Sequence, residues 1–222
     1  MKTAIVHDWF AGYAGSERVV ESFTNIFPQA DVFTLFNFLN EEEEKIVLKG
    51  KKPKTSFIQN LPGARKNHRK YLPLFPYAIE QFDLSNYDLI LSSSHAVAKG
   101  VLTNANQVHI CYCHTPIRYA WDLTHQYLRE ANLLRGFKAS AAKTILHYIR
   151  NWDVQSSNRV DYFIANSNYI ARRINKVYRR NADVIYPPVD IDKFSLKEKK
   201  EDYYIAASRL VPYKRIDLIA KA

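Results

Sequence analysis

The sequence contains little cysteine, and this scarcity limits the chemistry that it can carry. Among 222 residues the only cysteines are Cys111 and Cys113. They lie two positions apart in one expected strand, where a disulfide between them would be strained. Two cysteines alone cannot complete a tetrahedral zinc site. We therefore expect two reduced, packed thiols, and we expect no metal site.

The sequence also lacks a long apolar run and a secretory leader. No stretch approaches the roughly 20 apolar residues of a membrane-spanning helix. The first ten residues, MKTAIVHDWF, carry one lysine and a short apolar run that His7 and Asp8 interrupt. This pattern is typical of a first strand and differs from a cleavable signal. We therefore expect a cytoplasmic protein.

Apolar, aromatic and basic residues are abundant. A content of 47% hydrophobic and 14% aromatic residues excludes a disordered chain. The net charge of +10 suits a nucleic acid, an anionic membrane surface or a phosphorylated ligand. The basic residues gather in four runs, at 49–54, 65–70, 172–180 and 197–200. A solvated surface is the plain alternative for each run.

The surroundings of these basic runs favour some partners over others. No zinc finger, ribonucleoprotein strand motif or compact helix-turn-helix accompanies them, so we expect no nucleic-acid partner. The segment 66–77 (KNHRKYLPLFPY) instead mixes basic residues with aromatics and prolines. This mixture suits the interface of an anionic bilayer or a lipid-linked acceptor. We therefore expect a possible peripheral contact with the inner face of the plasma membrane.

Strand and helix patterns alternate along the chain. A β-rich or apolar character predicts strands at 3–9, 31–36, 55–58, 88–92, 108–113, 161–165 and 183–186. Apolar stripes and caps predict helices at 16–27 with Ser16 as N-cap, at 70–82, over most of 116–159, and from a cap at Asn166 and Ser167 through Tyr178. This alternation predicts an α/β fold with a doubly wound, Rossmann-like parallel sheet.

The composition changes after Pro188, which suggests a domain boundary. We expect residues 1–188 to form an N-terminal domain and the charged stretch 189–202 to be a linker. Residues 203–222 then begin with a strand at Tyr203–Ala207 and a helix from Ile216. A strand and half a helix cannot bury a core alone, so we expect a second domain that is truncated at residue 222.

The stretch 108–122 (VHICYCHTPIRYAWD) is the centre of the predicted site. It places His114 at the carboxyl end of a buried strand, where open α/β sheets bind ligands. Tyr119, Trp121 and Asp122 follow and suit a polar ligand, although a packed helix start explains them equally well. Asp8 ends the first strand and faces the same edge if the sheet is correct. The alternative for His114 is a structural turn histidine.

Four motifs in order carry a resemblance to a family. The chain resembles the N-terminal half of retaining GT-B glycosyltransferases of family 4, also called group 1, and is most similar to mannosyltransferase-like members that build surface polysaccharides. The motifs are AGYAGSERVVE (11–21), CHTPIRYAWD (113–122), NSNYIARRINKVY (166–178) with VIYPPVDIDKF (184–194), and SRLVPYKRIDLIAKA (208–222). The resemblance covers essentially every segment.

The resemblance implies roles for individual residues on the donor side. Arg209 and Lys214 match positions that contact the donor diphosphate, and their charges suit a leaving group that gains negative charge. Gly12 and Gly15 match the first glycine-rich loop, where backbone N–H groups approach a phosphate. This chemistry uses a nucleotide-sugar as co-substrate and needs neither cofactor nor metal.

On the acceptor side, His114 matches the active-site histidine, whose neutral ring can donate and accept hydrogen bonds to the transferred sugar and the acceptor. Asp8 is expected to orient an acceptor hydroxyl, and Tyr119, Trp121 and Asp122 to bind the acceptor or sugar. The resemblance implies mannose from GDP-mannose as first donor, with UDP-sugars next. The implied acceptor is a lipid-linked glycan or surface polysaccharide.

One departure from the family is large, and three alternatives stay open. The paired-glutamate motif of the donor domain is absent, so we expect the 222-residue chain alone to be inactive. One alternative is a non-catalytic acceptor-binding fragment that needs a separate donor domain. Another is a basic module that binds membranes or nucleic acid. An NAD-dependent oxidoreductase fits less well, because the first loop lacks the dinucleotide glycine spacing. The sequence leaves the oligomeric state open.

Overall fold

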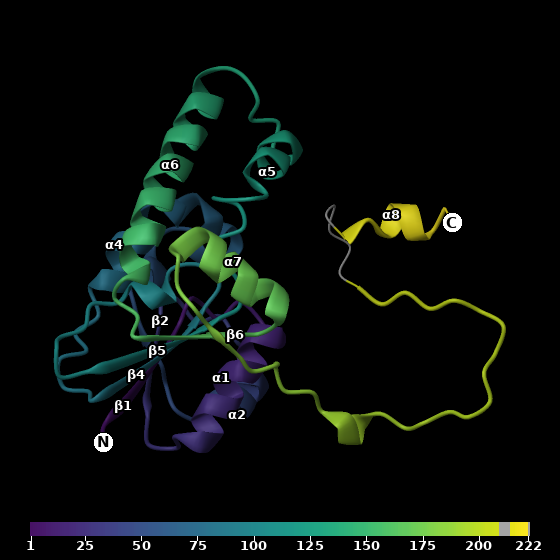
Figure 1. The fold of residues 1–222 in the computed structure, drawn as a ribbon, viewed down its shortest axis with the longest axis horizontal. Helices are drawn as coiled ribbons and strands as arrows, with labels where there is room; N and C mark the ends of the chain where they lie inside the picture. The colour runs from purple at the N-terminus through teal and green to yellow at the C-terminus, as the bar shows by residue number, and fades with distance from the viewer. Residues whose placement is uncertain (209–213, 222) are drawn as a thin grey trace. The chain divides into compact units, whose positions relative to one another are not determined.

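Seven parallel strands form one sheet in the order β3-β2-β1-β4-β5-β6-β7 (Figure 1). The computed structural model describes residues 1–208 and 214–221, and the chain divides into two compact units, 1–188 and 189–222. The strands are β1 Thr3–His7, β2 Asp31–Thr34, β3 Lys54–Thr55, β4 Leu89–Ser94, β5 Val108–Cys113, β6 Tyr162–Ala165 and β7 Asp183–Val184. The Rossmann-like fold class predicted from the sequence is confirmed.

Helices cover both faces of the sheet, in keeping with the burial of every residue of β1 and β4. On one face α1 (Gly15–Ile26) and α2 (Glu41–Leu48) pack through Val20 and Leu48 against Ile5 and Leu91. The other face is covered by α4 (Phe75–Glu80), α6 (Phe137–Ser157) and α7 (Asn168–Tyr178). The remaining elements of this unit are α3 (Ala64–Asn67), α5 (Thr124–Glu130), η1 (Phe57–Asn60), η2 (His68–Leu74) and η3 (Ala98–Gly100).

The strand order reverses between β1 and β4, and this reversal positions the site. The chain runs outward from β1 to β3 and then returns to place β4 on the other side of β1. In register, His7 lies opposite Ser93, and Ser94 lies opposite Cys113. The carboxyl ends of β1, β4 and β5 therefore meet at a switch point, which is where such sheets bind ligands.

Several predicted elements need correction. Helix α2 was not predicted, and the strand expected at 55–58 is only β3, because the Ser56 hydroxyl accepts the Ile58 N–H and starts η1 instead. The helix expected at 70–82 is divided between η2, which contains Pro73, and α4. The N-cap of α1 is Ala14 and not Ser16, so Ser16 lies in the first turn.

Other predictions hold. Ser167 caps α7, which ends at Tyr178 as expected. The region 116–159 is largely helical, as α5 and α6. Cys111 and Cys113 are free and buried, as expected, and burial is the first cause that raises the pKa of the Cys113 thiol.

The unit 189–222 contains η4 (Ile191–Lys193) and α8 (Ile216–Ile219). The strand expected at Tyr203–Ala207 does not form there, and its side chains are exposed. A strand is stabilised by pairing with neighbours, and the described part of this unit has no sheet to pair with. The helix expected from Ile216 is present as α8.

Candidate functional site

Three side chains at the carboxyl ends of neighbouring strands form a connected polar chain. Ser93, at the end of β4, lies between the two histidines that end β1 and follow β5. His7 Nδ1 lies 3.1 Å from both the carbonyl oxygen and the hydroxyl of Ser93. The same hydroxyl lies 2.8 Å from His114 Nε2. His7 and Ser93 are fully buried, whereas His114 is half-buried.

These contacts assign the proton on each ring. The Ser93 carbonyl oxygen can only accept, so His7 Nδ1 carries a proton and donates it. The Ser93 hydroxyl can then give its own proton to His114 Nε2. Burial, helped by His95 and His7, lowers the pKa of His114 to about 3. His114 is therefore a neutral imidazole with its proton on Nδ1.

Glu17, in the first turn of α1, lies beside His7 at one end of this series of polar contacts. Its Oε1 lies 3.6 Å from His7 Nε2, and both side chains are buried. Burial alone would raise the pKa of Glu17, but His7 lowers it below the ordinary value. Glu17 is therefore an anion that faces the far nitrogen of His7.

The Asp8 carboxylate is held by the loop that follows β4. It is completely buried and accepts four backbone N–H groups at 2.5–2.9 Å, from His95, Ala96, Val97 and Ala98. Burial would raise its pKa, but His95, 3.0 Å away, and the loop hold the pKa well below its usual range. Asp8 thus fixes the loop that carries His95, and its predicted contact with an acceptor hydroxyl stays a prediction.

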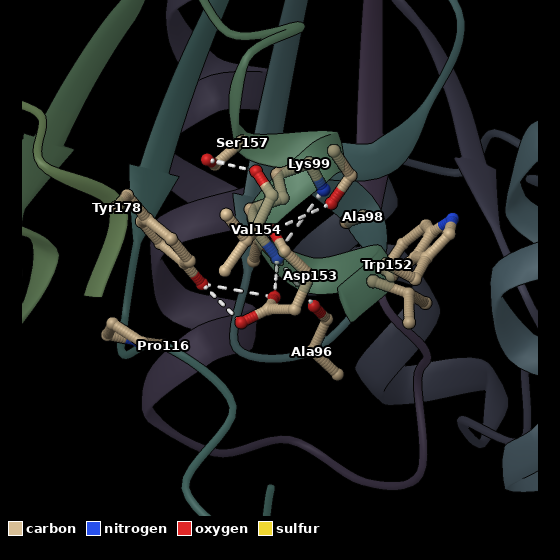
Figure 2. Close-up of polar contacts among 12 residues, drawn as sticks. Ala96, Ala98, Lys99, Pro116, Trp152, Asp153, Val154, Ser157 and Tyr178 are labelled. Carbon is tan, nitrogen blue, oxygen red and sulfur yellow. Dashed lines mark hydrogen bonds and ion pairs between the residues drawn. The ribbon is translucent and has the colours of Figure 1, made fainter. Parts of the chain in front are cut away.

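A second buried aspartate holds the same loop from its other end (Figure 2). Asp153 of α6 forms an ion pair with Lys99, whose ammonium also donates to the Ala96 carbonyl at 3.1 Å. Asp153 further accepts from Trp121 Nε1 at 2.7 Å and from the Tyr178 hydroxyl at 3.0 Å. Burial would lower the pKa of Lys99, but Asp153 raises it above the ordinary value.

The three predicted sugar-binding residues separate in the structure. Trp121 is half-buried and committed to Asp153, and Asp122 forms an exposed ion pair with Arg173 of α7. The Tyr119 hydroxyl is buried and has no hydrogen-bond partner among the described residues. Burial, and then the charge of Asp8, raises the pKa of Tyr119. A buried, unpaired hydroxyl costs about 1–3 kcal/mol, and the contact of Tyr119 with a sugar stays a prediction.

The glycine-rich loop precedes α1, and its backbone donors already have acidic partners. The Tyr13 N–H donates to Glu43 at 3.1 Å, and the Ala14 N–H donates to Glu17 at 3.0 Å. Gly12 has φ of 156°, a conformation that side chains rarely adopt, and Gly15 begins α1. A phosphate at this loop would have to displace two carboxylates.

The two predicted donor-side cations belong to the last part of the sequence. Arg209 falls outside the described residues, and Lys214 belongs to the unit 189–222. Their contact with a diphosphate therefore stays a prediction.

The sequence reasoning missed Ser93, His7 and Glu17 as members of the site. A signal was present, because His7-Asp8, Ser93–His95 and His114 each follow or end a predicted strand. Among the described residues no group of three or more His, Cys, Asp or Glu side chains could hold a metal ion. No helix in the described ranges is long and apolar enough to cross a membrane.

Comparisons with known proteins extend these observations. The crystal structure of Anabaena Alr3699/HepE in complex with UDP is similar at 16% identity and a TM-score of 0.47, over 86% of this chain and 45% of that one. The same protein in complex with UDP and glucose gives 15% identity and a TM-score of 0.46, over 86% and 46%. This chain thus spans less than half the length of those solved structures. No curated protein sequence matches it.

The family comparison covers most of the chain. The family model for Glycosyltransferase Family 4 matches residues 13–193, which include Gly15, Ser93, His114 and α7. The chain therefore belongs to Glycosyltransferase Family 4.

Proposed function

We propose that this chain is the acceptor-side domain of a retaining GT-B glycosyltransferase. It would move a sugar from a nucleotide-sugar to a lipid-linked or surface-polysaccharide acceptor, with mannose from GDP-mannose as the first donor to test. Membership of Glycosyltransferase Family 4 supports a sugar-transferring enzyme. The observation that carries the site is the neutral His114, which Ser93 holds at the switch point of the sheet.

His114 acts by hydrogen bonding in this proposal. Its Nε2 is engaged by Ser93, so Nδ1–H remains as the polar group that can bind a sugar hydroxyl. A neutral ring serves this purpose at pH 7 without adding a positive charge beside the sugar. The buried Tyr119 hydroxyl would donate to a second ligand oxygen and thereby gain the partner that it lacks within the described residues.

The leaving group is the other half of the reaction. As the sugar departs, negative charge grows on the nucleoside diphosphate, and Arg209 and Lys214 would stabilise it as a planar fork and a point charge. The loop that Gly12 and Gly15 flank would present the Tyr13 and Ala14 N–H groups to the same phosphates after Glu43 and Glu17 release them. We propose that residues 203–222 begin a donor-binding domain and that 189–202 link it to the first.

The test compares the complete protein with residues 1–222. Each would be incubated with GDP-mannose and a panel of UDP-sugars, together with a polyprenyl-diphosphate-linked glycan, and release of nucleoside diphosphate and the product mass would be measured. We expect transfer by the complete protein, retained in the presence of a chelator, and none by residues 1–222. Efficient transfer by residues 1–222, or no release from any donor by the complete protein, would overturn the proposal.

A further inference from the structure

The hairpin formed by α5 and α6 carries an exposed apolar apex, residues 131–138, which we call the α5–α6 tip. Phe137 is 89% exposed and Leu134 is 54% exposed. Figure 1 shows α6 running away from the sheet, with the turn to α5 at its far end. The 21 residues of α6 span about 30 Å, so this apex is remote from the core of its unit.

The hairpin keeps its shape without these two side chains. Leu128 of α5 packs with Leu146 and Ile149 of α6 in a cluster that also includes the half-buried Leu133. The carboxyl-terminal part of α6 is fixed to the body through buried residues such as Asp153. Phe137 and Leu134 therefore contribute apolar surface to the outside of a hairpin that other residues hold together.

Cations surround this apolar surface. Arg129, Arg135, Lys138 and Lys143 are all exposed, and from 129 to 148 the single acidic residue is Glu130. The tip thus combines two large apolar side chains with a net positive charge.

We propose that the α5–α6 tip inserts into the interfacial region of an anionic lipid bilayer. A protein partner fits less well, because lysine is depleted from the cores of protein interfaces. Apolar side chains flanked by lysine and arginine are the composition that lies between the acyl chains and the headgroups of anionic membranes. Of the partners that a positive net charge suits, an anionic bilayer is therefore the one that complements the tip in both charge and polarity.

The basic segment 66–77 provides a matched control surface. It too has exposed apolar side chains, with Leu74 at 41% and Tyr77 at 56%. Much of it is used in packing, however, since the Tyr71 hydroxyl donates to the Pro62 carbonyl at 2.6 Å and Leu72 is half-buried. The Tyr77 ring lies 5.9 Å from that of Phe57. We assign bilayer insertion to the tip and not to this segment.

Insertion of the tip would also place the site near the membrane. The hairpin follows directly after His114 and β5, so it leaves the sheet at the same edge as the polar chain of His7, Ser93 and His114. An acceptor glycan anchored in the bilayer would then be presented to that edge. In this respect the inference rests on the proposed function.

The experiment measures co-sedimentation of the 222-residue chain with vesicles of phosphatidylcholine alone and with mixed phosphatidylcholine–phosphatidylglycerol vesicles. The tip variant is Leu134→Ser with Phe137→Ser, and the control variant is Leu74→Ser with Tyr77→Ser. We expect the wild type to bind the mixed vesicles more tightly, with affinity that falls as salt is added. The tip variant should lose about tenfold or more of that affinity, and the control variant should bind like the wild type.

A third variant, Phe137→Trp, reports insertion directly, because lipids brominated on their acyl chains should quench its fluorescence beyond the quenching seen in the wild type. Three outcomes would each overturn the assignment. The tip variant could bind the mixed vesicles as tightly as the wild type, the control variant alone could lose binding, or the wild type could fail to bind. Circular dichroism melts verify that the variants fold. The readout is vesicle binding and not sugar transfer, so failure here is distinguishable from failure of the proposed function.

Discussion

Asp8 and Asp153 are both completely buried and both hold the segment 95–100, yet their partners differ in kind. Asp8 accepts backbone N–H groups from one loop and lies beside His95, whose side chain is 26% exposed. Asp153 is held by side chains from three separate segments, those of Lys99 and Tyr178 (Figure 2) and that of Trp121.

The difference indicates that the two carboxylates stabilise different features of the protein. Because the partners of Asp153 come from distant parts of the chain, Asp153 fixes the packing of η3, α6 and α7. The partners of Asp8 are consecutive residues after β4, so Asp8 fixes the local path of the loop beside the site. Asp153 should therefore control global stability, and Asp8 should control the geometry of the site.

The largest effect is expected from Asp153→Ala. This change leaves the Lys99 ammonium buried without its counter-ion, which should lower the free energy of unfolding by about 3–5 kcal/mol. Urea denaturation of residues 1–222 measures it. The double variant Lys99→Met with Asp153→Leu removes both charges and should recover most of the loss. If the single variant were as stable as the double variant, Asp153 would not have the role assigned here.

A smaller effect is expected from Asp8→Asn. The amide nitrogen would face backbone N–H donors, and two of those donors would lose their acceptor. We expect a loss of about 2–3 kcal/mol in the free energy of unfolding, together with altered amide chemical shifts over residues 95–98. If the amide chemical shifts of this loop were unchanged, Asp8 would not control the geometry of the site, and the contrast drawn with Asp153 would be wrong.

The pH dependence of the free energy of unfolding tests the role of Asp8 further. Its pKa is held below the unfolded value of about 3.9, so its contribution is complete above that pH and is lost as the pH falls further. The stability gap between wild type and Asp8→Asn should therefore narrow as the pH falls below about 4. Burial lowers the pKa of His109 to about 4, so His109 destabilises both proteins equally between pH 6.5 and 4. A gap that widened below pH 4 would contradict the assignment.

The smallest change in stability, about 1 kcal/mol, is expected from Ser93→Ala. Without the hydroxyl, His114 Nε2 loses its donor, and the ring proton should shift from Nδ1 toward Nε2. Long-range ¹H–¹⁵N correlation spectra of the imidazoles measure this population. His109 is an internal control, because the Arg159 carbonyl lies 3.1 Å from its Nδ1 and holds its proton there. Ser93→Ala should therefore leave the proton of His109 in place.

Much of the fold could be predicted, and the failures have physical causes. The apolar stripe of α7 and the Ser167 cap are local signals, and the structure reproduces both. Helix α2 begins with four consecutive glutamates, a pattern that suggests a solvated charged segment. In the structure Asn40 caps the helix, and Val47 and Leu48 are buried. The predicted strand at Tyr203–Ala207 needs a pairing partner that the described part of its unit does not contain.

The site could be predicted only in part. His114 and Asp8 were recognisable because each follows a strand, but their partners depend on strand order. His7 meets Ser93, which is 86 positions away, because the chain returns to place β4 beside β1. Nor does the sequence reveal that the Asp8 carboxylate is filled by the N–H groups of its neighbouring loop, since this depends on the path of the backbone after β4.

The transfer rate of the complete protein with His114→Ala tests the central claim most directly. It would be measured against the wild type with whichever nucleotide-sugar the wild type consumes, and a thermal melt would confirm that the variant folds. Our account predicts a fall of about 100-fold or more in turnover, because the variant loses the Nδ1–H that Ser93 orients toward the sugar. A folded variant that transfers sugar at the wild-type rate would contradict it.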